Sequence, residues 1–233
     1  MQEVEQRRSS CRGRAGAITC HFTLGFVSQA NDLLSGVMEL INKCNIELPA
    51  WVEPFLKNYQ EPLSTISQRM QLAIALAEEN VHQQTGGPFG AVVVNEETGE
   101  LISVGVNLVT TAALSIAHAE IVALSLAQSA VGTWNLSRSG SLQLVSSCEP
   151  CAMCFGSLPW SGVKSLICGA RKKDAETAGF DEGDKPEQWW KFLKSRNIQV
   201  TRDVLRQNAI AVMQRYIDMG GIIYNGRSSL DTK

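Results

Sequence analysis

Short β-rich runs alternate with helix-forming segments along most of this chain, and that alternation restricts its fold more than any other feature. Residues 64–83 carry apolar side chains at a helical period, and the pair Gly86-Gly87 then stops the helix. Two β-rich runs follow, at residues 91–94 and 101–106, on either side of a glycine-containing turn. This pattern predicts a helix followed by a β-hairpin.

The same alternation continues toward the C-terminus. The sequence predicts three more strands, at residues 142–145, 163–168 and 198–201. It also predicts four more helices, at residues 118–130, 151–158, 186–193 and 204–219, with Pro186 in the first turn of the third. Strands separated by helices indicate an α/β fold. We expect a three-layer α/β/α sandwich in which a mixed five-stranded sheet is covered by helices on both faces.

The N-terminal part differs from this main domain. Residues 1–37 contain an arginine cluster, but Glu3 and Glu5 argue against a transit peptide, so we expect an upstream extension or a disordered tail before a true start at Met38. We further expect a docking segment at residues 38–62, in which Leu48-Pro49 and Glu53-Pro54 break any early helix. The main domain then covers residues 63–226, and residues 227–233 form a tail.

Composition excludes several classes of protein. The net charge of −2 over 233 residues gives no basic surplus, which disfavours nucleic acid as a partner. Seven cysteines are an odd number, and three of them lie within residues 148–154, so a reducing cytoplasm and a metal site fit better than a secreted disulfide framework. We see no apolar run of the roughly 18 residues that a membrane helix needs, and we expect no membrane contact.

Two short motifs carry the chemistry of the chain. The first is His118-Ala119-Glu120, and the second is Cys151-Ala152-Met153-Cys154, directly after Pro150. Cysteines three residues apart on a helix share one face, and a helix N-terminus favours the thiolate form that binds metal. One imidazole and two sulfurs, from His118, Cys151 and Cys154, are a ligand set that suits zinc, one ion per chain.

Three protein ligands leave a tetrahedral ion one position for water, which is typical of a catalytic site. Side chains two residues apart on a helix diverge by roughly 200°, so we expect Glu120 to act as the acid/base rather than as a ligand beside His118. The alternative is a closed structural site with Cys148 as fourth ligand, in a zinc-stabilised binding module without catalysis. Pro150 interrupts helical continuity between Cys148 and Cys151, which argues against it.

Each motif is weak alone, but His-x-Glu followed by Pro-Cys-x-x-Cys is the signature of zinc deaminases. The chain resembles the cytidine deaminase-like superfamily, and within it is similar to bacterial guanine deaminases from about residue 46 to residue 226. The similarity rests on four stretches, at residues 86–91, 105–107, 147–156 and 178–182, the last of which favours guanine.

The resemblance implies roles for four further residues. Asn107 would hydrogen-bond a purine, Phe89 would stack on it, and Trp160 would line the pocket. Glu182 would be a second catalytic acid, although some relatives have aspartate there. From the residues alone, the alternatives are that Phe89 and Trp160 are core aromatics, Asn107 a turn residue, and Glu182 part of a solvated acidic loop.

The resemblance further implies hydrolysis of guanine to xanthine and ammonia by a cytoplasmic homodimer that takes a small-molecule nucleobase. Other amino-heterocycles stay open as substrates: a triazine such as ammeline, guanosine, a cytosine nucleotide or adenosine in tRNA. Residues 222–225, after the last Gly pair, are expected near a pocket, either their own or a partner's.

Overall fold

The computed structural model describes residues 41–226 of the 233. The chain divides between Cys44 and Asn45, and every element below belongs to the part that starts at Asn45. The expectations for residues 1–37 and for the tail at residues 227–233 lie outside the described residues. The boundary at Met38 therefore stays a prediction.

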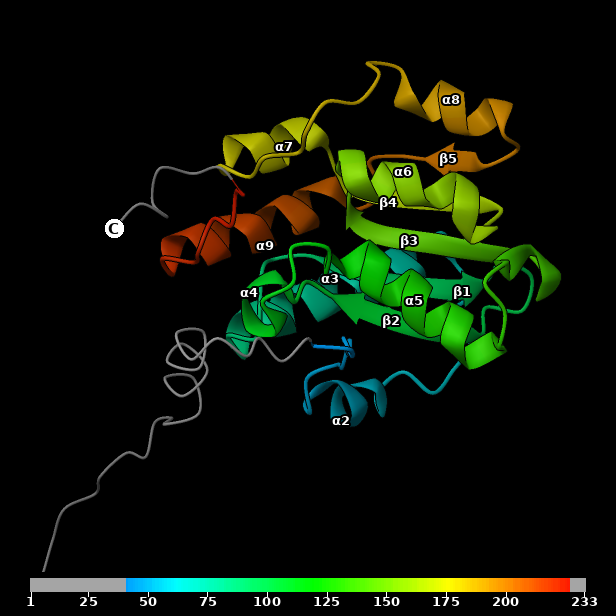
Figure 1. Cartoon of the computed structure of the whole chain (residues 1–233), viewed down its shortest axis with the longest axis horizontal. Helices are drawn as coiled ribbons and strands as arrows, with labels where there is room; N and C mark the ends of the chain where they lie inside the picture. Colours follow the sequence, from blue (N-terminus) through cyan, green and yellow to red (C-terminus); the bar gives the residue numbers. More distant parts are fainter. Residues whose placement is uncertain (1–40, 227–233) are drawn as a thin grey trace, which may run out of the picture. The chain divides into compact units, whose positions relative to one another are not determined.

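A mixed five-stranded sheet forms the centre of the fold, as predicted (Figure 1). Its strands lie in the order β2-β1-β3-β4-β5. β1 is antiparallel to both β2 and β3, whereas β3, β4 and β5 run parallel to one another. The strands are β1 (Gly90–Asn95), β2 (Leu101–Val106), β3 (Leu142–Cys148), β4 (Ser165–Ala170) and β5 (Gln199–Thr201).

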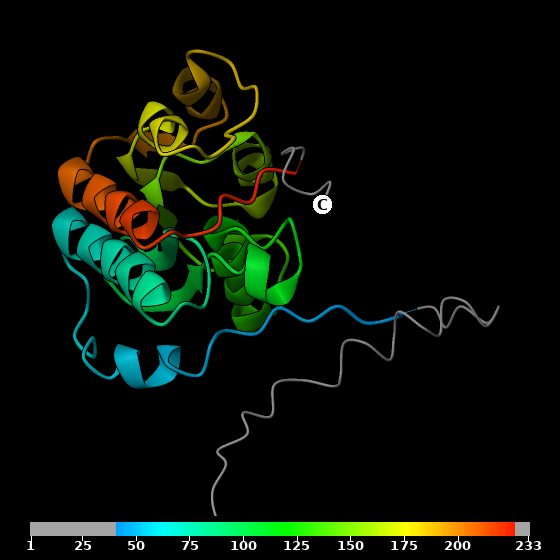
Figure 2. The same ribbon diagram turned by 90° about the vertical axis from the view of Figure 1, so that its left-hand side faces the viewer.

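Helices cover both faces of this sheet, so the predicted three-layer sandwich is confirmed. Helices α3 (Ile66–His82) and α9 (Arg206–Asp218) lie side by side on one face, as Figure 2 shows. Helices α5 (Ala119–Val131) and α6 (Ala152–Ser161) cover the other face. Alternate buried residues of β1 divide between the two cores: Val92 and Val94 face α3, and Ala91 and Val93 face α5.

Five shorter elements complete the described part of the chain: α2 (Val52–Leu56), α4 (Val109–Ala112), η1 (Leu136–Arg138), α7 (Lys172–Thr177) and α8 (Trp189–Ser195). The prediction that Glu53-Pro54 excludes a helix is wrong, because Pro54 lies in the first turn of α2, where a backbone N–H has no intrahelical partner. Helix α8 begins at Trp189 rather than near Pro186. The sequence patterns did not predict α4, η1 and α7.

Among the described helices, none has both the length and the apolar character needed to cross a membrane.

The ends of the elements place two helix N-termini at the same end of the sheet. Strand β3 ends at Cys148, and Cys151 is the N-cap of α6 three residues later. His118 is the N-cap of α5, which packs closely on β2 because a Cβ at Gly105 would lie only 2.1 Å from the carbonyl oxygen of Ala119. The fold therefore brings both sequence motifs to one edge of the sheet.

Candidate active site

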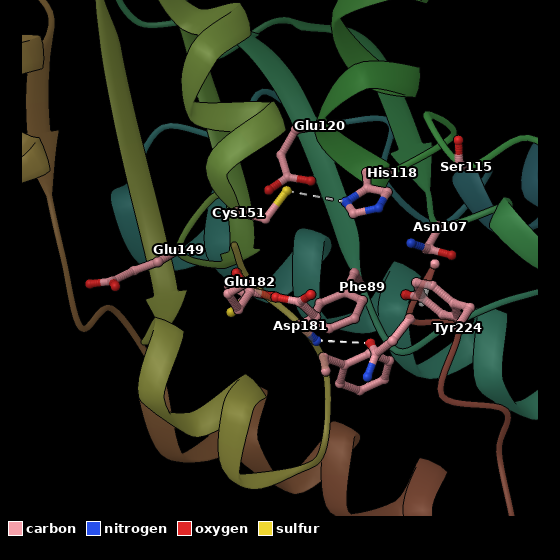
Figure 3. Close-up of a pocket in the computed structure, with 14 residues that line it drawn as sticks. Phe89, Asn107, Ser115, His118, Glu120, Glu149, Cys151, Asp181, Glu182 and Tyr224 are labelled. Atoms are coloured by element: carbon pink, nitrogen blue, oxygen red, sulfur yellow. Dashed lines mark hydrogen bonds between the residues drawn. The ribbon is translucent and has the colours of Figure 1, made fainter. Parts of the chain in front are cut away.

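The three predicted metal ligands converge at this edge. The ligand atoms of His118, Cys151 and Cys154 all lie within 4.8 Å of one another. Figure 3 shows the contact between Cys151 Sγ and His118 Nδ1, which are 3.5 Å apart. A hydrogen bond from Cys154, together with the hydrogen bond and the charge of His118, outweighs the effect of burial and lowers the pKa of Cys151 to about 4. The site therefore favours a thiolate, the form of cysteine that binds metal.

The donor set fits zinc in an open, three-ligand site. One imidazole and two sulfurs match catalytic zinc centres that leave a position for water. Among the described residues, the cluster has these three members. Cys148 instead directs its thiol to the carbonyl oxygen of Arg171 at 3.8 Å, so the geometry does not favour it as a fourth ligand.

Glu120 lies beside this cluster in the first turn of α5. It is only 6% exposed, and its Oε2 accepts a hydrogen bond from the Cys154 thiol at 3.4 Å. Burial raises the pKa of Glu120. A group that takes up and releases protons works best when its pKa lies near the working pH, so this direction suits a general acid/base. A buried carboxyl beside a metal-ligand set is typical of a group that handles protons.

Glu182 is also buried at this edge, which excludes the solvated-loop interpretation. It is 7% exposed, and its backbone oxygen accepts from Ala152 N, in the first turn of α6. Burial raises the pKa of Glu182 to about 8, and the negative charge of Cys151 adds to that effect. Two carboxyls with raised pKa therefore face the same ligand cluster.

These groups line a cavity of about 180 Å³. Three buried polar atoms in its wall have no hydrogen-bond partner: Asn107 Nδ2, Glu182 Oε2 and Tyr224 OH. Buried polar atoms are nearly always paired, so three unpaired ones around one cavity indicate a polar ligand. The small volume, below the roughly 300–1,000 Å³ of pockets for drug-sized ligands, favours a compact molecule.

Asn107 presents a hydrogen-bond donor to this cavity. Its Oδ1 accepts from Val109 N at 3.2 Å, which leaves Nδ2 free. Asn80, fully buried on α3, donates to the backbone oxygens of both Asn107 and Gly87 at 2.9 Å. Asn107 therefore fits both interpretations: its Oδ1 stabilises a turn, and its Nδ2 faces the cavity.

Comparison with known proteins bears directly on this arrangement. Residues 63–170 match the family described as cytidine and deoxycytidylate deaminase zinc-binding region. The guanine deaminase of Bacillus subtilis is 39% identical over 125 residues, which cover 51% of this chain and 77% of that protein. The chain belongs to the guanine deaminase family.

Solved structures agree with this family. The guanine deaminase from Nitrosomonas europaea superposes with a TM-score of 0.71 at 41% identity, covering 77% of this chain and 98% of that one. A mutant protein solved in complex with 8-azaguanine gives a TM-score of 0.70 at 42% identity, covering 75% of this chain and 97% of the other. These similarities place the chain in the cytidine deaminase-like superfamily, as its motifs predicted.

Of the two aromatic residues predicted to contact the substrate, Phe89 lines the cavity of this guanine deaminase family member and Trp160 does not. Phe89 lines the cavity and packs edge-to-face on Phe180, with ring centroids 4.9 Å apart. Trp160 is 80% exposed and does not line the cavity, so the structure does not place it in the pocket of its own chain. Helix α6 turns Cys154 and Leu158 inward, and Trp160 lies on its outer face.

The sequence patterns did not assign several cavity residues. Tyr224 and Asn225, from the segment after α9, line the cavity of their own chain, and Asn225 Oδ1 accepts from Asp181 N at 2.9 Å. The position of residues 222–225 near a pocket was predicted, but the only signal for Tyr224 was an aromatic residue after a helix-ending Gly pair. The remaining unassigned wall residues are Ser115, Cys148, Glu149, Phe180, Asp181 and Gly226.

Proposed function

We propose that this chain hydrolyses guanine to xanthine and ammonia, with one zinc ion held by His118, Cys151 and Cys154. The observation that carries the proposal is the small cavity in which a three-ligand metal cluster, two buried carboxyls and three unpaired polar atoms meet. The family relationship supports guanine as the substrate, because the relatives reported above are guanine deaminases or hold a guanine analogue.

Bound zinc would supply an activated water by lowering the pKa of that water toward neutrality. Glu120 takes up the proton that the water loses as its oxygen attacks C2 of guanine. Glu120 then delivers that proton to the ring nitrogen next to C2. Its raised pKa suits a group that must accept and release a proton in one cycle.

Glu182 supplies a second proton. Burial raises the pKa of its carboxyl and so favours the protonated form, which donates to the exocyclic amine as the bond from C2 to nitrogen breaks. The amine leaves as ammonia, and the hydroxyl added at C2 becomes the carbonyl of xanthine by giving its proton to the Glu182 carboxylate, which restores the acid. Two carboxyls thus divide the ring proton and the amine proton between them.

The cavity wall favours a flat purine base. Asn107 Nδ2 would donate to a purine acceptor, and Phe89 would stack on the ring. A free base also fits the limited volume better than guanosine or a cytosine nucleotide, each of which adds a sugar. Ammeline stays as the strongest small alternative, because it too carries an amino group on a flat ring.

An ammonia-release assay across candidate substrates tests this proposal. The purified chain, with its zinc content measured, is assayed on guanine, ammeline, guanosine, a cytosine nucleotide and tRNA. Release from guanine at a rate well above the others is the expected result. A chain that holds zinc and releases ammonia from none of them would instead support the binding module.

We also propose that the protein works in a reducing cytoplasm, in purine catabolism, as a homodimer without nucleic-acid or membrane partners. The site supports the first part, since its metal ligands include two thiols that oxidation would remove. The net charge of −2 supports a small-molecule substrate. Light scattering of the purified protein should give twice the 25.4 kDa of one chain.

A further inference from the structure

Glu182 lies on a segment that has no regular secondary structure of its own. Residues 178–188, between α7 and α8, form neither helix nor strand. A carboxyl group prefers water to a buried site, so an irregular segment carrying one would tend to swing outward. Glu182 nevertheless faces the cavity beside Cys151 (Figure 3). Its position must therefore come from contacts made by the surrounding residues.

Two lysines fix this segment by hydrogen bonds, and we call the pair, Lys172 and Lys185, the lysine clasp. One lysine lies outside the segment and donates to it, and the other lies within the segment and donates outward. Lys172, the first residue of α7, donates from Nζ to the backbone oxygen of Gly183 at 2.7 Å. Lys185, within the segment, donates from Nζ to the backbone oxygen of Pro150. Gly183 directly follows Glu182, and Pro150 directly precedes Cys151. The clasp therefore joins the backbone around one catalytic carboxyl to the backbone around one metal ligand.

Neighbouring groups hold each lysine in place. Lys185 Nζ lies 4.9 Å from the ring centre of Trp189, a cation–π arrangement, and Lys172 Nζ is 3.3 Å from Glu176 Oε1. The backbone N–H of Lys172 also donates to Glu149 Oε2 at 3.0 Å, and Glu149 is buried and ion-paired with Arg202. A charged donor on a carbonyl makes a stronger hydrogen bond than a neutral one, so these two contacts are well suited to fixing a loop.

We propose that Lys172 and Lys185 are positioning residues that hold Glu182 in register with the metal-ligand loop. The proposal rests on the proposed function, because it takes Glu182 as the proton donor to the leaving amine. Neither lysine lines the cavity, so both act through Glu182 rather than on the substrate. A displacement of about 1 Å in a catalytic group can cost about 100-fold in rate.

The test compares Lys185→Met with Lys191→Met, which removes the same charge at an exposed position on α8. We expect Lys185→Met to lower kcat for guanine about 10- to 100-fold with little change in KM, because proton donation acts on the transition state. Zinc content and Tm should match those of the wild type, and Lys185→Arg should recover most of the loss. Hydrogen exchange at residues 179–186 should accelerate in Lys185→Met and not in Lys191→Met.

A double-mutant cycle separates positioning from general structural support. If the clasp acts through Glu182, then the Glu182→Gln/Lys185→Met variant should be no slower than Glu182→Gln alone. Losses that multiply, or a Lys185→Met variant with wild-type kcat, would overturn the clasp while leaving the proposed function intact. Lys172→Met provides an independent variant if Lys185→Met loses zinc or stability. Unchanged kinetics in Glu182→Gln itself would remove the role of Glu182, and a wild-type protein inactive on guanine would remove the proposed function.

Discussion

Two buried polar clusters lie at opposite ends of the same sheet, and they differ in how completely they are hydrogen-bonded. At the end away from the cavity, Arg69 donates to Gln143 Oε1 at 2.9 Å and to the backbone oxygen of Glu96 at 3.0 Å. Gln143 in turn donates to Ser165 Oγ at 2.7 Å. None of the side-chain atoms in this network is among the unpaired buried atoms of the described residues.

The cavity cluster at the other end is incomplete. Asn107, Glu182 and Tyr224 each bury one polar atom without a partner. Because these atoms line the cavity, their hydrogen bonds can come from a ligand or from water rather than from the protein. One polar cluster therefore supports the fold, whereas the other leaves hydrogen-bonding capacity for a ligand.

The largest effect should follow from Glu120→Gln at the cavity end. The variant keeps the shape of the side chain but cannot exchange a proton, so kcat for guanine should fall about 10²–10⁴-fold. Zinc content and Tm should stay close to those of the wild type, because the substitution alters chemistry rather than packing. Ammonia release and metal analysis on the same sample check both statements. A variant with near-normal turnover would show that Glu120 is not the acid/base.

The opposite behaviour is expected from Arg69→Met at the other end. Loss of the guanidinium leaves the buried acceptors on Leu63 and Gln143 and the partly buried one on Glu96 unpaired, which should lower the free energy of unfolding by about 3 kcal/mol. Kinetic constants measured well below the Tm should not change. Urea unfolding is the measurement, with Arg138→Met at an exposed position as the control. A strong loss of kcat in the folded Arg69→Met protein would mean that the two ends are not separable.

The pH dependence of stability should distinguish the ends as well. Burial and the charge of Cys151 raise the pKa of Glu182 from 4.5 to about 8, so between these values the folded protein binds a proton that the unfolded chain releases. The contribution of this group is therefore complete below pH 4.5 and is lost as the pH rises to about 8, by up to about 1.4 kcal/mol per pH unit.

Urea unfolding of the zinc-free protein between pH 5 and 8 measures this dependence. The difference in free energy of unfolding between the wild type and Glu182→Gln should shift against the wild type as the pH rises. A difference that stays constant across the range would place the carboxyl of Glu182 in contact with water.

How much of this could be read from the sequence depends on the range of the interaction. The strands and long helices were predicted to within a few residues, because hydrophobic period and glycine stops are local signals. His118, Glu120, Cys151 and Cys154 were also found locally, since each motif lies at the start of one helix. The spacing of residues within each motif does not reveal that the two motifs meet in space. The structure shows that the two helix starts lie together at one edge of the sheet.

Positions that depend on tertiary direction were harder to predict. Trp160 follows the Cys151–Cys154 motif on α6, but the face of α6 on which it lies, away from the cavity of its own chain, is set by the burial of Leu158. Pro54 predicts a helix break from the sequence, but the structure places it in the first turn of α2, where no intrahelical hydrogen bond is lost. Tyr224 was not assigned, because an extended segment after α9 carries no pattern that says where its side chains point.

Tyr224→Phe should have the smallest and most specific effect, because it removes one unpaired atom and little else. The ring stays packed against Phe180, with centroids 5.4 Å apart, and the buried hydroxyl that lacks a partner is gone. The free energy of unfolding of the ligand-free protein should therefore stay the same or rise by about 1 kcal/mol. If the hydroxyl bonds the ligand, affinity for 8-azaguanine should fall about 5- to 10-fold at the same time. Calorimetric titration measures the affinity and urea unfolding measures the stability, both on one preparation.

Tyr216→Phe is the control for this prediction. Tyr216 OH donates a hydrogen bond to the backbone oxygen of Ile222, so its loss should lower the free energy of unfolding instead. Unchanged affinity of Tyr224→Phe for 8-azaguanine would mean that the Tyr224 hydroxyl makes no hydrogen bond to the ligand.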